Sequence, residues 1–275
     1  MRTLKRTVRL LPRSVLMVVI LLWVLVPVYF LVVTSLSPEG DLLDGLELPS
    51  SFTLTNYAGL FSGANSIWIP LINSTIVTIA STVIALVLAV PAAYALSHLR
   101  HRRSGRMAYL SFFVLRGIPP IALVMPFYLI FAKVQMLNTL PGIIIALAPL
   151  ALPYCVWTLR VTFDQIPREV EEAGAVDGAG RMRMFFSVVL PIATPGIAAT
   201  GILAGLFIYV DYIIVAPLAG PQTYTFPIYV TSFSQDFVQL VGPLSAAAIV
   251  GAVPMALMFI VSQGFSRRLA SAGIH

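Results

Sequence analysis

The residues able to do chemistry are few, and their arrangement favours recognition over catalysis. The charged passage that lies deepest in the chain runs from 167 to 191 and opens with Glu169, Glu171 and Glu172. Carboxylates in a first turn suit the positive end of a helix dipole. The apolar segments hold no Ser/His/Asp set and no paired carboxylates for hydrolysis. The sequence also has no GxxxxGK[ST] loop that would cradle a nucleotide phosphate.

The histidines and the cysteine give no sign of metal binding. His98 and His101 stand beside Arg100 and Arg102, with no cysteine or carboxylate at metal-ligand spacing. We therefore expect both histidines to be interfacial or solvated, and we expect no metal site. Cys155 is the single cysteine, so it forms no internal disulfide, and we expect it to be a small apolar packing residue.

The passage from 167 to 191 predicts two short helices around a glycine corner. Pro167 suits the first position of a helix, and Asp177-Gly178 ends that helix, because glycine readily takes the left-handed conformation of a helix end. A second helix restarts near Arg181. The middle of the first helix is small, which lets a groove on another protein approach the backbone closely. Its small residues are Ala173, Gly174 and Ala175.

One charged pair is expected within the apolar segments. Arg116 is the single basic residue there, and Asp211 is the one carboxylate. Counted along a helix from Arg106, Arg116 lies about 15 Å deep, which is the middle of a bilayer. A charge at that depth normally faces a bundle interior or a water-filled cavity. Three roles are open for Arg116: an ion pair with Asp211, a contact with substrate, or a contact with a partner subunit.

Residues near this depth form a candidate substrate path. Gly117 and Pro119 break the helix beyond Arg116, and transporters commonly place their substrate at interrupted helices near the midplane. Tyr154 and Trp157 are either substrate-stacking rings or ordinary core residues. Asn73 either lines the path or hydrogen-bonds a neighbouring helix. The candidate path comprises Arg116, Gly117, Pro119, Asn73, Tyr154, Trp157, Tyr209 and Asp211.

The elements that must position these residues are membrane-spanning helices. The 275-residue chain is 59% hydrophobic and 10% charged, whereas soluble domains carry about 25% charged residues. We expect an all-α polytopic membrane protein in which residues 1–13 are a cytoplasmic N-terminus and residues 14–275 are the transmembrane domain. Six apolar segments are long enough to span. They lie at about 14–36, 69–97, 107–131, 141–160, 192–217 and 243–264.

The basic residues test this topology. With the N-terminus in the cytoplasm, fifteen of the 17 Lys and Arg residues fall in cytoplasmic segments, and only Lys133 falls outside. This asymmetry is what the positive-inside rule describes. The net charge of +6 is therefore a topology signal, and we expect no nucleic-acid partner. The passage from 167 to 191 lies between the fourth and fifth spans, on the cytoplasmic side.

This cytoplasmic passage resembles a known motif. Glu172-Ala173-Gly174, Asp177-Gly178-Ala179, Phe185 and Leu190-Pro191 resemble the EAA loop of binding-protein-dependent ABC importer permeases, which have the type I fold. The resemblance implies that the first short helix is a coupling helix that docks into a cleft on a cytoplasmic ATPase. The coupling residues implied are Glu171, Glu172, Ala173, Gly174, Asp177, Gly178, Ala179 and Phe185.

Shorter stretches are similar to the carbohydrate-uptake branch of that family, specifically the second permease subunit of maltose-type transporters. They include Thr55-Asn56-Tyr57, Ala93-Tyr94-Ala95-Leu96, Pro119-Pro120, Leu137-Asn138-Thr139 and Thr225-Phe226-Pro227. The fifth span departs from the family pattern. It ends in Tyr209-Val210-Asp211, where Trp-Asn followed by an acidic residue is usual.

The resemblance implies a non-catalytic subunit of an ATP-driven sugar importer, with no cofactor of its own. ATP and Mg²⁺ would bind the partner ATPases. The implied partners are a second permease subunit, two ATPase subunits, an extracytoplasmic solute-binding protein and the lipid bilayer. The implied location is the plasma (inner) membrane, with several spans and both termini in the cytoplasm.

Two kinds of alternative remain open at this point. The same machine would serve a phosphorylated sugar, an amino sugar or another polar solute. An intramembrane enzyme or an ion channel is the alternative of a different class. An enzyme should carry a catalytic set in its spans, and a channel needs no cytoplasmic docking helix.

Overall fold

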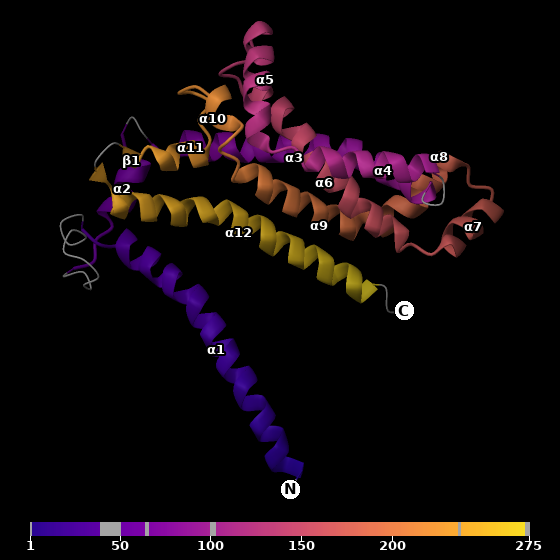
Figure 1. Ribbon diagram of the computed structural model, residues 1–275, viewed down its shortest axis with the longest axis horizontal. Helices are drawn as coiled ribbons and strands as arrows, with labels where there is room; N and C mark the ends of the chain where they lie inside the picture. Colours follow the sequence, from indigo (N-terminus) through magenta and orange to yellow (C-terminus); the bar gives the residue numbers. More distant parts are fainter. Residues whose placement is uncertain (1, 39–50, 64–65, 100–102, 236–237, 273–275) are drawn as a thin grey trace. The chain divides into compact units, whose positions relative to one another are not determined.

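The computed structural model describes residues 2–38, 51–63, 66–99, 103–235 and 238–272, which are almost entirely helical (Figure 1). His101, Arg100 and Arg102 lie outside these residues. The chain divides into two compact units, which we describe separately. The first comprises Met1–Ile67 and Val230–Ala252, and the second comprises Trp68–Tyr229 and Val253–His275.

Five helical segments among the described residues are long and apolar enough to cross a membrane, and a sixth is bent. The straight candidates are Ser14–Ser35 within α1 (Arg2–Ser35), α3 (Trp68–His98), α6 (Leu140–Asp164), the continuous run Arg181–Tyr209, and Val241–Ile260 within α12 (Val241–Ala272). The bent candidate consists of α4 (Arg103–Arg116) and α5 (Pro120–Lys133), which meet at 87°.

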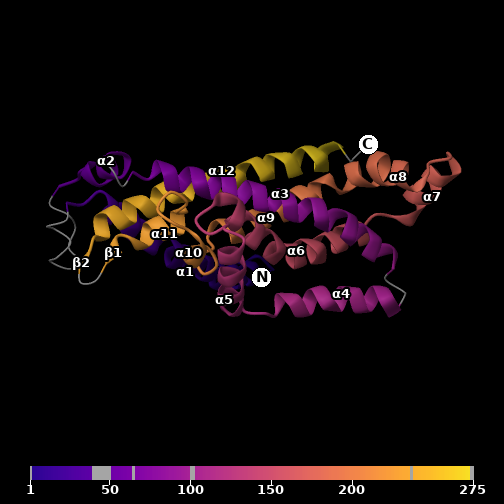
Figure 2. The same cartoon turned by 90° about the horizontal axis from the view of Figure 1, so that it is seen from above.

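The span predicted at 107–131 is therefore not one continuous helix. It ends at Arg116 and restarts after Pro119, whose φ of −62° and ψ of 131° are extended. The break coincides with the glycine and prolines that predict it, because a proline ring disfavours helix in the residue before it. In Figure 1, α5 stands across the direction of α3 and α6. Figure 2 shows α4 running along α6, which it contacts.

The span predicted at 192–217 differs at both ends. The helix already begins at Arg181 as α8 (Arg181–Met184), passes through a π-helical turn at Phe185–Val189 and continues as α9 (Leu190–Tyr209). Proline has no backbone N–H to donate, so it usually interrupts a helix. Here the π-helical turn ends at Val189, two residues before Pro191, and the helix continues past this proline. The far end is shorter than predicted. The chain turns after Tyr209 and forms only one short helix, α10 (Val215–Leu218).

The first unit is held by buried polar groups around α2 (Thr55–Phe61). The Asn56 side chain is buried, and its Nδ2 donates to the carbonyl oxygens of Ser35 at 3.0 Å and Ser37 at 2.9 Å. Tyr57 Oη lies 2.8 Å from Ser35 Oγ. Thr34 Oγ1 donates to Ser245 Oγ at 2.9 Å, which ties the end of α1 to α12. These contacts account for the Thr-Asn-Tyr stretch after the first span.

The second unit has its core where α3, α6 and α9 pack together. Small residues line the contact, as is usual where membrane helices approach closely. Position 196 needs a residue without a side chain, because a Cβ at Gly196 would collide with the Thr162 side chain. Cys155 is fully buried in this core, as predicted for a small packing residue.

Short elements complete the chain after α10. They are α11 (Phe226–Thr231) and a two-stranded antiparallel ladder of β1 (Ser234–Gln235) with β2 (Val238–Gln239), in which Ser234 pairs with Gln239. The ladder is the one departure from helix among the described elements, and the prediction of an all-α fold did not include it.

Candidate functional site

The predicted coupling passage folds as two short helices around a corner. α7 (Arg168–Val176) carries Glu169 and Glu171 in its first turn. Pro167 precedes α7 as its N-cap, so the expected helix start is one residue early. In both views α7 lies beyond the ends of α3, α6 and α9 (Figures 1 and 2).

The corner depends on Gly178. Its φ is +81°, in the left-handed region that glycine adopts without strain. The Ala179 N–H donates to the Gly174 carbonyl at 2.9 Å and the Gly178 N–H donates to the Ala175 carbonyl at 3.1 Å, which satisfies carbonyls at the helix end. The predicted glycine corner is confirmed.

The small residues of α7 face two ways. Ala173 and Ala175 are exposed, whereas Gly174 faces back into the protein. A Cβ at Gly174 would lie 2.6 Å from the terminal methyl group of Met184, so α7 packs closely on α8 at this position.

Several coupling candidates are presented to solvent. No residue of α7 is buried, and Glu172, Asp177 and Gly178 are all exposed. Val176 at the tip is 88% exposed, an unusual position for an apolar residue outside the predicted spans. Val176 was not among the predicted coupling residues, although its apolar side chain stands directly before the Asp177-Gly178 corner.

Phe185 is the coupling candidate that is buried instead. Its ring centroid lies 4.9 Å from the ring of Tyr94 on α3, and Tyr94 also packs edge-on against Phe163 at 5.6 Å. Phe185 therefore anchors the passage to the second span and does not belong to the exposed face of α7.

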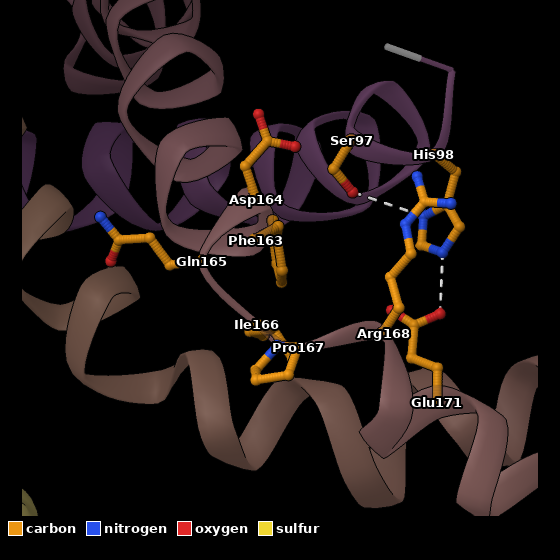
Figure 3. A pocket seen from close by; sticks show the side chains of 9 residues that line it. All are labelled: Ser97, His98, Phe163, Asp164, Gln165, Ile166, Pro167, Arg168 and Glu171. Atoms are coloured by element: carbon orange, nitrogen blue, oxygen red, sulfur yellow. Dashed lines mark hydrogen bonds and ion pairs between the residues drawn. The ribbon is translucent and has the colours of Figure 1, made fainter. Parts of the chain in front are cut away.

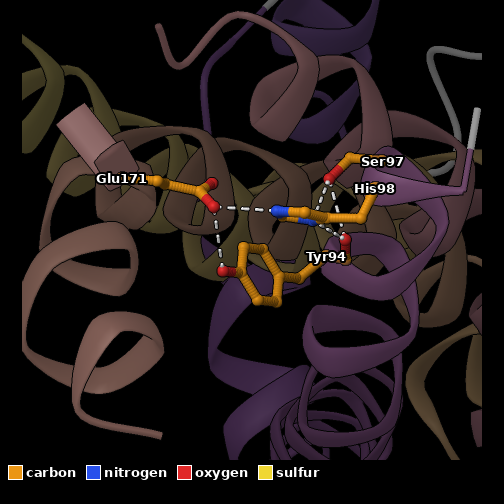
Figure 4. Close-up of polar contacts among 4 residues, drawn as sticks. All are labelled: Tyr94, Ser97, His98 and Glu171. Atoms are coloured by element: carbon orange, nitrogen blue, oxygen red, sulfur yellow. Dashed lines mark hydrogen bonds and ion pairs between the residues drawn. The ribbon is translucent and has the colours of Figure 1, made fainter. Parts of the chain in front are cut away.

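Glu171 connects α7 to α3 through two side chains that the sequence did not single out for this role. Its Oε2 lies 2.8 Å from His98 Nε2 and accepts a hydrogen bond from Tyr94 Oη at 3.4 Å (Figure 4). The other ring nitrogen of His98, Nδ1, lies 3.0 Å from the Tyr94 carbonyl. The prediction that His98 is interfacial or solvated agrees with its 47% side-chain exposure. No group of metal-ligating residues occurs among the described residues.

A polar cavity of about 270 Å³ lies beside this contact (Figure 3). It is bounded by the end of α3, the connection from α6 to α7 and the first turn of α7. Its lining residues are Ser97, His98, Phe163, Asp164, Gln165, Ile166, Pro167, Arg168 and Glu171.

Within the candidate substrate path, the structure brings Arg116 together with two aromatic rings. The Arg116 guanidinium carbon lies 5.0 Å from the centroid of the Tyr154 ring and 6.0 Å from that of Trp157. Both distances are within the range of cation–π attraction. The Tyr154 ring also packs edge-on against Phe207 at 5.4 Å. A small cavity of about 160 Å³ is lined by Arg116, Trp157, Tyr109, Phe112 and Pro153.

Asp211 does not join this group. No ion pair links it to Arg116 in the described part of the chain, so the ion-pair interpretation of Arg116 is wrong for this conformation. Asp211 Oδ1 instead accepts a hydrogen bond from the Ile214 N–H at 3.0 Å. The carboxylate thereby caps the turn that follows α9.

Asn73 and Tyr209 are also placed elsewhere. Asn73 Nδ2 donates to the carbonyls of Gln222 and Tyr224, both at 3.0 Å. Both amide hydrogens of this buried residue thus hold the loop before α11. The Tyr209 ring is 3% exposed and stacks on Phe226 with centroids 5.9 Å apart. Gly117 and Pro119 form the break between α4 and α5.

This architecture matches a known family. Residues 85–271, more than half of the chain, match the binding-protein-dependent transport system inner membrane component family. The chain belongs to this family. It is therefore a permease component of a binding-protein-dependent transport system, which confirms the resemblance to this family and the assignment to a membrane with several spans.

Curated relatives of the permease align along most of their length. The trehalose transport system permease protein SugB of Mycobacterium tuberculosis is 32% identical over 252 residues, covering 90% of each chain. The diacetylchitobiose uptake system permease protein NgcG of Streptomyces coelicolor is 31% identical over 264 residues, covering 92% of this chain and 84% of the relative. The maltodextrin transport system permease protein MdxG of Bacillus subtilis is 29% identical, covering 83% and 82%.

Solved structures share the permease fold. A chain of a bacterial ABC transporter involved in the import of the acidic polysaccharide alginate matches with a TM-score of 0.74 and 21% identity, over 92% of this chain and 94% of that one. An inward-facing MetNI methionine ABC transporter matches with a TM-score of 0.65 and 15% identity, over 76% and 99%. These likenesses establish the helical importer fold. They do not establish a cargo, because the two transporters carry different solutes.

Proposed function

We propose that this permease carries a carbohydrate across the inner membrane as one of two membrane subunits of an ATP-driven importer. The observation that carries the proposal is α7, a short helix with no buried residue that lies beyond the ends of α3, α6 and α9. A helix that packs so little on its own chain, yet has a defined corner and an exposed valine at its tip, is suited to docking in a cleft of another protein.

The partner for α7 is a cytoplasmic ATPase. Glu172, Asp177 and Gly178 present charge and backbone on its exposed side, and Val176 supplies an apolar anchor. Buried apolar anchors surrounded by polar groups carry much of the energy of protein interfaces. Two ATPase subunits would bind ATP and Mg²⁺, and their closure would move α7. This permease binds no cofactor in that cycle.

In the proposed topology, α7 and both termini lie in the cytoplasm. The charge asymmetry supports this arrangement, since fifteen of the 17 basic residues then lie on the cytoplasmic side. The opposite side faces a solute-binding protein that delivers the cargo. Residues 14–275 form the transmembrane domain that pairs with the second permease subunit.

The proposed cargo is a neutral sugar or oligosaccharide. Trehalose, diacetylchitobiose and maltodextrin appear in the names of its relatives. The cluster of Arg116, Tyr154 and Trp157 offers what a sugar requires, namely a charged hydrogen-bond donor beside aromatic faces. It stands at a helix break near the expected midplane, where transporters commonly bind their substrates.

The test is transport by the whole assembly. The permease should be co-expressed with its second permease, ATPase and solute-binding protein, and reconstituted in proteoliposomes. We expect ATP-dependent accumulation of a labelled disaccharide or oligosaccharide that requires the binding protein. ATP-dependent uptake of amino acids but of no sugar would overturn the cargo, and solute flux without ATP or the ATPase would overturn the importer assignment.

A further inference from the structure

Few contacts hold α7 on the rest of the chain. No residue of α7 is buried, so packing alone gives it little support. Two contacts fix its orientation on the rest of the chain. Gly174 packs on Met184, and Glu171 reaches the end of α3. The second contact is the one that joins α7 to a membrane span distant in sequence.

Tyr94 and His98 stand one helical turn apart on α3, so both side chains reach the same carboxylate oxygen (Figure 4). We call Tyr94, His98 and Glu171 the α3–α7 latch. It spans 73 and 77 residues of sequence and joins the cytoplasmic end of the second span to the first turn of α7.

His98 Nε2 faces the Glu171 carboxylate, and His98 Nδ1 faces the Tyr94 carbonyl, so both ring nitrogens point at acceptors. Only the doubly protonated imidazolium can donate to both. The pair is an ion pair when both ring nitrogens carry a proton, and the two contacts fix the orientation of the ring. It is partly exposed, which keeps it weak enough to open and close as α7 moves.

The latch also contacts the core of the second unit through Tyr94. The Tyr94 ring packs against Phe163 on α6 and Phe185 in the π turn. A displacement of Glu171 would therefore move α3 through the contact with His98. It would also act on α6 and the π turn, because the Tyr94 ring packs against both. A cavity of about 270 Å³ adjoins the latch and is lined by His98, Glu171 and Arg168 among others (Figure 3).

We propose that His98 and Tyr94 are positioning residues that hold Glu171, so that a movement of α7 is transmitted directly into the second membrane span. This inference rests on the proposed docking of α7 on an ATPase. A link of this kind is expected to consist of contiguous side chains that join two elements. The latch supplies that continuity between α7 and α3.

The experiment compares His98→Ala, Glu171→Gln and the exchange His98→Glu with Glu171→His in the complete transporter in proteoliposomes. The measured quantities are solute carried per ATP hydrolysed and the amount of ATPase that co-purifies. Glu169→Gln is the matched control. It removes the same charge from the same helix, and no hydrogen bond or ion pair of Glu169 occurs among the described residues.

We expect each single latch variant to carry about tenfold less solute per ATP, within the range of allosteric coupling effects, while the ATPase stays bound. The double variant His98→Ala with Glu171→Gln should be no worse than either single variant, because the two residues act through one contact. The exchange should restore most of the lost coupling. Glu169→Gln should lose clearly less.

The inference is overturned if both single variants keep the wild-type ratio of solute to ATP. It is also overturned if both disappear from the membrane and the exchange does not recover them, since the latch would then be a folding contact. Failure of the proposed function looks different. In that case the ATPase would not co-purify even with the unaltered permease.

Discussion

The Arg116 guanidinium lies over the Tyr154 ring at 5.0 Å and makes no ion pair with Asp211. Arg116, which is expected near the middle of the membrane, is therefore part of an aromatic cluster with Tyr154 and Trp157. A guanidinium on an aromatic face keeps its outward N–H groups free to donate, which an arginine neutralised by a carboxylate does less well. The first prediction follows from this arrangement.

Arg116→Ala should leave the permease in the membrane but lower sugar uptake by about tenfold to a hundredfold, as expected for a lost hydrogen bond from a charged donor. Arg160→Ala is the matched control, since Arg160 also lies over a ring, that of Tyr109 at 4.1 Å, between the same two helices. It should impair uptake less. Adding Asp211→Ala should not rescue Arg116→Ala. Uptake at the wild-type rate by Arg116→Ala would remove Arg116 from the substrate path.

Gly178→Ala should weaken the corner after α7. The left-handed conformation costs a residue with a side chain about 1–2 kcal/mol, and Gly178 has φ of +81°. Gly180→Ala is the control, because φ is −66° there and a Cβ would meet no atom within 4 Å. We expect less co-purified ATPase and less uptake with Gly178→Ala than with Gly180→Ala. Equal behaviour of the two variants would show that the corner conformation is unimportant.

Asn73→Ala should lower thermal stability in detergent. The substitution leaves the carbonyls of Gln222 and Tyr224 without their donor, at a cost of about 1–3 kcal/mol. Thr75→Ala, two residues further along α3 at an exposed position on the opposite side of the helix, is the control. A melting temperature for Asn73→Ala equal to that of Thr75→Ala would indicate that the loop before α11 is held by other contacts.

The topology is tested with single cysteines on a Cys155→Ala background. A membrane-impermeant thiol reagent should label Ser62→Cys in intact cells and should label Arg181→Cys only after the membrane is opened. Both positions are exposed on the chain, so access depends on the side of the membrane. Labelling of Arg181→Cys in sealed cells would contradict the cytoplasmic placement of α7.

The parts of the fold that depend on local signals were predictable. Gly178 fixes the corner through its own backbone, and Gly117 with Pro119 break the third span at the place where they occur. The contact between His98 and Glu171 was not predictable, because it joins residues 73 positions apart and depends on how α3 and α7 pack. The partner of Arg116 was also missed. Counting residues along a helix gives its depth in the membrane but not the direction in which its side chain points.

Val176, in the proposed interface, was also not predicted from the sequence. The motif drew attention to the charged and small residues of α7, whereas the structure adds an apolar side chain that is 88% exposed at the tip. An apolar side chain that is exposed on the isolated chain often marks a surface that a partner covers in the complex. It gives the most direct test of the central claim, which is that α7 docks on an ATPase.

That test is site-specific photo-cross-linking in the assembled transporter. A photoreactive amino acid should be placed at Val176 and, as a control, at Val87, an exposed valine on the membrane helix α3. The account predicts an adduct with the ATPase from position 176 and none from position 87. No ATPase adduct from position 176 in a complex that retains the ATPase, or equal adducts from both positions, would contradict it.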